Sequence, residues 1–170
     1  MSVRRSVPED NKQITKIYQK AFDTDDEAQL VGSLLESGVP NISLVYEDGK
    51  DIVGHILFTK VDLENNGSEI KIAGLAPMGV MPRDQYRGIG SSLVKAGLDE
   101  CKSDGYDAAV VIGHNTFYPK FGFVPAVKFG ITSTFRVPED VFMAQELIPG
   151  ALQDKHGTIK FHQAFDRFKR

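Results

Sequence analysis

The 170-residue sequence predicts an α/β (α+β) fold, in which helices flank a mixed and mostly antiparallel sheet. Two segments with apolar residues at helical spacing precede three strand-like segments that are separated by turn residues, which indicates an antiparallel meander. A further helix then leads into a strand with the pattern of a fully buried one, as in a βαβ-like unit. Because no repeat or change of composition divides the chain, we expect a single domain over residues 1–170.

The first quarter of the sequence predicts one short strand and two helices. Ser2–Ser6 is expected to form an edge strand. A helix should begin at Pro8, because the first turn of a helix does not need the amide that proline lacks. The second helix should cover Asp25–Glu36, with Gly38 just past its end. The apolar stripe of the first helix consists of Ile14, Ile17, Tyr18, Ala21 and Phe22.

The next segment predicts three consecutive strands. Ile42–Glu47 is rich in β-branched and aromatic residues, and Asp48–Asp51 has the composition of a hairpin turn. Ile52–Val61 would be the returning strand. After a second turn at Asn65–Gly67, a long strand should run from Glu69 to about Met81.

The second half begins with a helix over Ser91–Lys102, which Gly105 should end. Asp107–Gly113 (DAAVVIG) is typical of a fully buried strand, and Asn115–Phe121 predicts a short helix. We expect one or two strands within residues 122–134 and packed terminal segments at 142–147 and 158–165.

Composition excludes several classes of protein. The balance of 20 Lys and Arg against 23 Asp and Glu gives a net charge of −3, which argues against dedicated binding of nucleic acid or of an anionic membrane. No apolar run approaches the roughly 18 residues of a membrane span, and none follows the charged N-terminus as in a signal peptide. A single cysteine excludes an intrachain disulfide framework, and no spacing of ligands suggests a metal site. We therefore expect a cytoplasmic protein.

The run from Val80 to Leu93 carries the clearest chemical signal. Gly88 and Gly90 lie between a strand and a helix, where exposed backbone amides at the positive end of a helix can bind an anion such as a pyrophosphate. Taken alone, Gly-x-Gly also fits a tight turn without a ligand. ATP or NAD is a weaker alternative, because the third glycine and the phosphate-loop lysine are absent.

The wider spacing resembles a known superfamily. The pattern Val-x-Pro-x-x-Gln-x-x-Gly-x-Gly over Val80–Gly90 resembles the acetyl-CoA-binding motif of the GNAT N-acetyltransferases. Asn115, Tyr118 and Gly122-Phe123 resemble the second cofactor-side motif of that superfamily. The segments Gly54–Val61, Leu75–Pro82, Val137–Leu152 and Gly157–Phe165 look most like its YhbS-type predicted acetyltransferases.

The resemblance implies a sheet of about six to seven strands, splayed between strands 4 and 5, and acetyl-CoA as cosubstrate without a metal. At the splay, free backbone groups of strand 4 would form hydrogen bonds with the pantetheine arm. The loop that follows the strand would hold the pyrophosphate. Asn115 matches a position that bonds the arm, although it could equally cap the short helix. The implied cofactor-binding residues are Met78, Gly79, Val80, Gln85, Tyr86, Arg87, Gly88, Ile89, Gly90, Ser91 and Asn115.

Tyr118 matches the general acid of the superfamily, which protonates the departing thiolate. The general base is not assigned, because Ala73–Ala76, which approach the splay, include no acid. His55 could titrate near neutrality, but a histidine in the middle of a strand is more often a satisfied structural residue.

The function expected from this resemblance is transfer of the acetyl group of acetyl-CoA to a primary amine that the sequence does not identify. The alternative is a non-catalytic module on the same fold that binds or senses acyl-CoA. A homodimer is compatible with the apolar C-terminal segments, which could equally complete the core.

Overall fold

A computed structural model describes residues 2–64 and 69–168, so the turn predicted at Asn65–Gly67 lies outside the described residues. The chain divides into two compact units. The first comprises Met1–Phe58 and Ala76–Asp99, and the second comprises Thr59–Leu75 and Glu100–Arg170.

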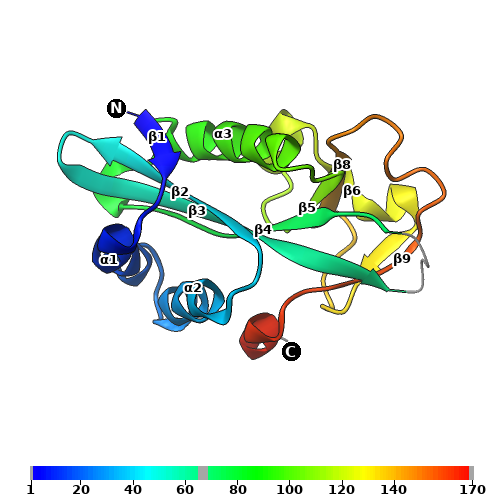
Figure 1. The fold of residues 1–170 in the computed structure, drawn as a ribbon, viewed down its shortest axis with the longest axis horizontal. Coiled ribbons are helices and arrows are strands. Elements are labelled where there is room, and N and C mark those ends of the chain that lie inside the picture. Colours follow the sequence, from blue (N-terminus) through cyan, green and yellow to red (C-terminus); the bar gives the residue numbers. More distant parts are fainter. Residues whose placement is uncertain (1, 65–68, 169–170) are drawn as a thin grey trace. The chain divides into compact units, whose positions relative to one another are not determined.

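The helices and strands follow one another in the predicted order (Figure 1). A strand and two helices precede three strands, a helix and a buried strand, which confirms the element order expected from the sequence. The strands and α-helices are β1 (Ser2–Arg5), α1 (Asn11–Ala21), α2 (Asp26–Ser37), β2 (Asn41–Asp48), β3 (Asp51–Glu64), β4 (Ile72–Val80), α3 (Ile89–Ser103), β5 (Ala108–Ile112), β6 (Val124–Pro125), β7 (Ile131–Ser133), β8 (Phe142–Glu146) and β9 (Gly157–Lys160). The 3-10 helices are η1 (Pro8–Asp10), η2 (Pro82–Asp84), η3 (Tyr118–Phe121), η4 (Ala126–Phe129) and η5 (Gln163–Phe168).

The first unit is a sheet with helices on both faces. Its strands follow the order β1-β2-β3-β4, and β1 runs antiparallel to β2. Figure 1 shows α1 and α2 on one side of β2 and β3, with α3 on the other side. Glycines allow this close approach: a Cβ on Gly54 of β3 would lie 2.9 Å from Ile89 of α3, and one on Gly79 of β4 would lie 2.9 Å from Tyr18 of α1.

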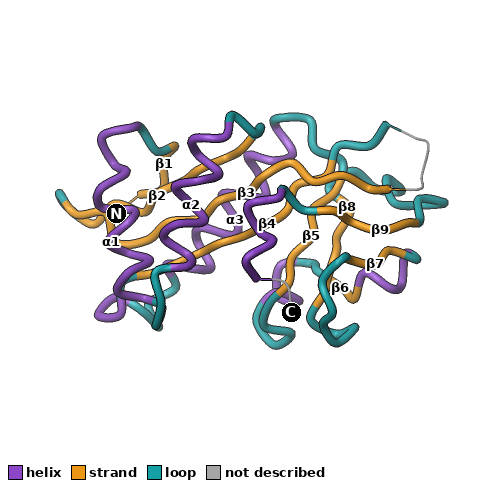
Figure 2. The backbone as a smooth tube through the Cα atoms, turned by 90° about the horizontal axis from the view of Figure 1, so that it is seen from below, coloured by secondary structure: helices purple, strands orange, loops and turns teal. Residues whose placement is uncertain are grey.

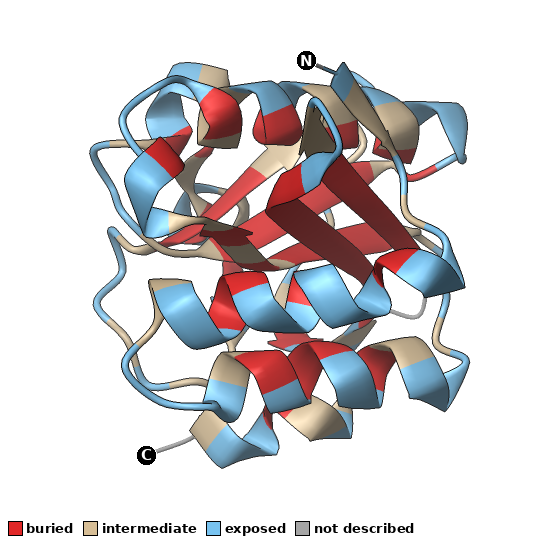
Figure 3. Cartoon of the chain, turned by 90° about the vertical axis from the view of Figure 1, so that its left-hand side faces the viewer, coloured by how far each residue is buried: buried red, intermediate tan, exposed pale blue. Residues whose placement is uncertain are grey.

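Helices α1 and α2 form because their apolar residues recur at helical spacing and pack against the sheet. Ile14, Ile17 and Tyr18 of α1 are buried, and Figure 3 shows how buried and exposed residues alternate along such helices. Helix α2 ends at Gly38, whose φ of +79° is the left-handed conformation that glycine adopts readily. Within residues 2–64 and 69–168, no helix has the length and apolar character that a membrane span requires.

The second unit contains one parallel pair of strands and several antiparallel ones. Ile72–Leu75 of β4 run parallel to Ala108–Val111 of β5, and β8 pairs antiparallel with β5. Figure 2 shows the strands in orange. Further along, β6 pairs with β8, while β9 pairs with β3 and β7 with β9. The β4–β5 ladder ends at Leu75 and Val111, whereas β4 continues to Val80. The splay predicted between strands 4 and 5 would begin beyond this point, and it stays a prediction.

Several boundaries differ from the sequence prediction by one to three residues, and two of these differences have a clear cause. The strand expected from Glu69 begins at Ile72, because its β5 ladder starts there and Lys71 instead exchanges hydrogen bonds with Asp107. The helix expected over Asn115–Phe121 is a 3-10 helix of Tyr118–Phe121, preceded by a turn. The two strands β6 and β7 confirm the prediction for residues 122–134.

Candidate functional site

The loop that joins β4 to α3 has the backbone shape of a binding loop. After η2, Tyr86 and Gly88 both adopt positive φ angles, of +64° and +82°. A Cβ at Gly88 would meet no atom within 4 Å, so open space lies beside this glycine. The Tyr86 side chain is fully exposed. The loop can therefore present its backbone directly to a ligand.

The first turn of α3 supplies hydrogen-bond donors to this loop. The N–H of Ser92 donates to the carbonyl of Gly88 at 3.0 Å, which is the first backbone bond of the helix. Among the described residues, none accepts a hydrogen bond from the N–H groups of Ile89, Gly90 and Ser91. Successive unpaired amides at the positive end of a helix bind phosphate oxygens well, so these residues fit the pyrophosphate of acetyl-CoA.

A buried aspartate fixes the loop, and sequence reasoning did not identify it. Asp84 is 5% exposed and accepts hydrogen bonds from Arg87 Nη1 at 2.7 Å and from Arg83 Nε at 3.2 Å. Arg87 also lies 3.9 Å from Asp48. The charge of Arg87 is therefore shared with two carboxylates, which reduces the charge that it can offer a phosphate. The three-residue spacing of Asp84 and Arg87 is the signal that could have revealed this pair.

The end of β4 is tied to the same loop. Gln85 Nε2 donates to the carbonyl of Val80 at 3.1 Å, and the N–H of Met81 donates to the carbonyl of Val53 at 2.8 Å. Met78 and Val80 are partly exposed, whereas Gly79 is buried. The predicted pantetheine segment and the predicted pyrophosphate loop thus lie together in the first unit.

Tyr118, the predicted general acid, belongs to the second unit. Its ring packs edge-on against Phe117 and Phe123, and a Cβ at Gly113 would lie 2.6 Å from it. Burial raises the pKa of Tyr118 to about 12, so the phenol stays protonated at neutral pH. No described residue makes a hydrogen bond to its hydroxyl, which leaves that proton available to a ligand.

Asn115 lies in the turn before η3, and its side-chain amide donates to Asp140. The N-cap residue of η3 is Phe117, and no side chain caps that helix. The alternative in which Asn115 caps the short helix is therefore wrong. The reason is that this helix begins three residues later than its sequence suggested.

His55 is fully buried in β3, and both of its ring nitrogens are hydrogen-bonded. Desolvation lowers the pKa of His55 to about 3. These contacts confirm that His55 is a satisfied structural histidine, and a group with so low a pKa is a poor base at neutral pH. The general base stays unassigned.

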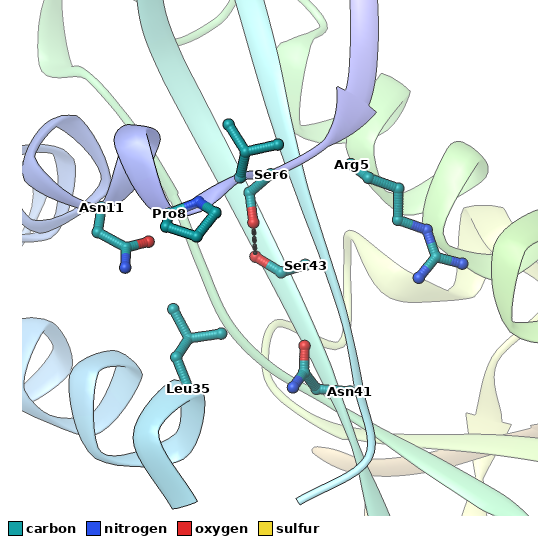
Figure 4. Close-up of a pocket in the computed structure, with 8 residues that line it drawn as sticks. Arg5, Ser6, Pro8, Asn11, Leu35, Asn41 and Ser43 are labelled. Carbon is teal, nitrogen blue, oxygen red and sulfur yellow. Dashed lines mark hydrogen bonds between the residues drawn. The ribbon is translucent and has the colours of Figure 1, made fainter. Parts of the chain in front are cut away.

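A pocket in the first unit contains none of the predicted site residues. Figure 4 shows it between the start of α1, the end of α2 and strand β2, with Ser6 and Ser43 hydrogen-bonded at 2.7 Å. The pocket lining comprises Arg5, Ser6, Val7, Pro8, Asn11, Leu35, Asn41 and Ser43.

Within the described residues, no group of three or more His, Cys, Asp or Glu could hold a metal ion.

Comparison with known families identifies the class of protein that this fold and loop define. Residues 2–126 match the acetyltransferase (GNAT) domain family, and the chain belongs to this family.

Particular relatives come from bacteria. The chain is 31% identical to the uncharacterized N-acetyltransferase YhbS of Escherichia coli K12 over 169 residues, which covers 99% of this chain and 100% of the relative. The YhbS crystal structure in complex with CoA has a TM-score of 0.93, with 30% identity over 98% of this chain and 92% of the other. A GNAT acetyltransferase from Brucella melitensis, in complex with acetyl-CoA, has a TM-score of 0.79 and 26% identity over 97% of each chain.

Proposed function

We propose that this protein transfers the acetyl group of acetyl-CoA directly to a primary amine. The observation that carries the proposal is the row of amides at Ile89, Gly90 and Ser91, which have no acceptor among the described residues and follow the glycine loop after β4 in a GNAT family member. Relatives along the whole chain have been crystallised with CoA or acetyl-CoA, which supports the same ligand here. The proposal includes a single acetyltransferase domain over residues 1–170 that acts in the cytoplasm.

The loop and the strand end would bind different parts of the cosubstrate. The amides of residues 88–91 would hold the pyrophosphate, with Gln85, Tyr86 and Arg87 forming the rest of the loop. Met78, Gly79 and Val80 would pair with the amides of the pantetheine arm, as a peptide pairs with a free strand edge. In the second unit, Asn115 is the proposed further contact with the arm.

The reaction needs one proton donor from the protein. The amine nitrogen attacks the thioester carbonyl, the C–N bond forms and the C–S bond breaks. Tyr118 gives its phenolic proton to the departing thiolate, while the proton lost by the amine passes to solvent. Because the pKa of Tyr118 is raised to about 12, the phenol carries its proton at neutral pH and this proton is present when charge develops on the sulfur.

A second candidate is a module that binds acyl-CoA without transferring its acyl group. The observation in its favour is that no general base is assigned, since Ala73–Ala76 include no acid and His55 is buried and bonded. A panel of amines distinguishes the two candidates. Cofactor binding with no turnover of any amine would favour the binding module.

Thermal unfolding with acetyl-CoA tests the proposal directly. A ligand at about 100 times its Kd stabilises the folded state by about 2.7 kcal/mol. At this chain length, that gain corresponds to a rise of roughly 5–10 °C in Tm. We expect this rise with acetyl-CoA and none with ATP or NAD. No rise at saturating acetyl-CoA would reject the proposed function.

A further inference from the structure

A buried chain of hydrogen bonds crosses the first unit and ends on β4. Ser6 Oγ donates to Ser43 Oγ at 2.7 Å, and Ser43 Oγ lies 2.8 Å from His55 Nε2. His55 Nδ1 lies 2.8 Å from the Tyr18 hydroxyl, which in turn lies 3.2 Å from the carbonyl oxygen of Pro77. Tyr18 and His55 are both 0% exposed. We call these four side chains the Tyr18 network.

One assignment of protons uses every donor of the network. Ser6 donates to Ser43, and Ser43 donates to Nε2 of a neutral His55. The Nδ1–H then donates to the Tyr18 oxygen, which leaves the Tyr18 proton for the carbonyl of Pro77. Desolvation keeps the ring neutral, because it lowers the pKa of His55 to about 3. No donor of this set is then left unpaired, which is the arrangement that buried polar groups require.

Tyr18 contacts β4 at two points. Its hydroxyl reaches the carbonyl of Pro77, and its ring lies so close to Gly79 that a Cβ there would be 2.9 Å from Cε1. The hydrogen bond at Pro77 and the packing contact at Gly79 lie two residues apart. Together they fix the distance of this part of β4 from α1 and the direction in which the strand runs. The segment between and after them, Met78–Val80, continues past the end of the β4–β5 ladder.

We propose that Tyr18 and His55 are positioning residues for the pantetheine arm of acetyl-CoA. They hold Pro77 and Gly79 against α1, so that Met78–Val80 keeps an extended edge ready to pair with the arm. Pre-organisation of this edge improves affinity, because no ordering of the strand is then needed on binding. This inference rests on the proposed function and assigns to these two side chains a role beyond packing.

The variant Tyr18→Phe tests this role, since it removes one oxygen and keeps the ring that packs on Gly79. Titration calorimetry uses two ligands: CoA contains the arm, whereas adenosine 3′,5′-bisphosphate keeps the nucleotide and lacks the arm and the second phosphate of the pyrophosphate. We expect the Kd for CoA to rise about tenfold, because a strand edge that this hydrogen bond no longer holds must be ordered when the arm binds. The Kd for the bisphosphate should stay within twofold of the wild-type value.

Tyr106→Phe is the matched control, because Tyr106 is another buried tyrosine and lies in the second unit. It should leave both Kd values unchanged. Hydrogen exchange at the amides of Met78–Val80 gives a second readout and should be faster in Tyr18→Phe alone.

Each other outcome has a distinct meaning. An unchanged Kd for CoA, or an equal loss for both ligands, would overturn the positioning role and leave the proposed function standing. A wild-type protein that binds neither ligand would reject the proposed function and this inference together.

Discussion

The surroundings of Tyr118, the proposed general acid, keep its phenol protonated at neutral pH. The side chain is 7% exposed and packed against aromatic rings, and burial alone raises its pKa to about 12. A phenol in this environment keeps its proton at neutral pH. The packing also limits the orientations of the ring, which favours one direction of proton transfer.

We predict that Tyr118→Phe lowers kcat by about 100-fold and leaves the Kd for CoA unchanged, because only proton donation is lost. Turnover is measured with an amine identified from the panel, and binding by calorimetry. The rate of the wild-type enzyme should not fall through Tyr118 ionisation below about pH 10, since the pKa is raised. A variant with wild-type kcat would exclude Tyr118 as the acid.

At the scale of elements, the packing of α3 on β3 depends on a glycine. A Cβ at Gly97 of α3 would lie 2.2 Å from Cε1 and 2.7 Å from Cζ of Phe58, which is fully buried in β3. Since α3 begins with the unpaired amides, its distance from the sheet also sets where those amides lie. Gly97 therefore links core packing to the geometry of the loop.

We predict that Gly97→Ala lowers the free energy of unfolding by about 1–3 kcal/mol, because the added methyl overpacks against Phe58. Gly32→Ala in α2 is the matched control. A Cβ at Gly32 would meet no atom within 4 Å, so alanine should stabilise that helix by about 0.5–1 kcal/mol. Urea denaturation measures both changes. A neutral or stabilising Gly97→Ala would contradict the close packing.

At the scale of the whole molecule, buried His55 makes stability depend on pH. Its pKa is lowered from 6.5 to about 3 by desolvation, so between these values the unfolded chain binds a proton that the folded protein does not. Above pH 6.5 the neutral His55 makes its full contribution to the free energy of unfolding. This contribution is lost progressively as the pH falls from 6.5 toward 3. The pKa of Asp10 is lowered by its hydrogen bond from Arg4, and stability from that pair is lost only below the usual carboxyl range.

We predict that the free energy of unfolding falls by about 2 kcal/mol between pH 7.5 and pH 5.0 through His55 alone. Denaturation curves at both values are compared with those of His55→Gln, which cannot ionise. The variant should be less stable at pH 7.5, but it should lose about 2 kcal/mol less than the wild type on acidification. Equal losses in the two proteins would show that His55 does not govern this range.

Local patterns were sufficient for most elements of the fold and for the loop. Apolar spacing located α1, α2 and α3 to within a few residues, because each helix buries one stripe. The spacing of Gln85, Gly88 and Gly90 marked the loop, since its shape depends on residues close together in the chain. Boundaries that depend on a distant partner were less accurate, as at Ile72, where the ladder with Ala108 decides the start of the strand.

The sequence by itself determined the element order, the family resemblance and the candidate site residues, because these depend on the spacing of residues that lie close together in the chain. The structure added the pair of Asp84 and Arg87, which their spacing could have revealed, and tertiary structure alone showed that Asn115 bonds Asp140 and that Tyr18 reaches both His55 and Pro77. The last three contacts join residues 25 to 59 positions apart in the chain. Their formation depends on how the strands and helices pack, which no local pattern of side chains encodes.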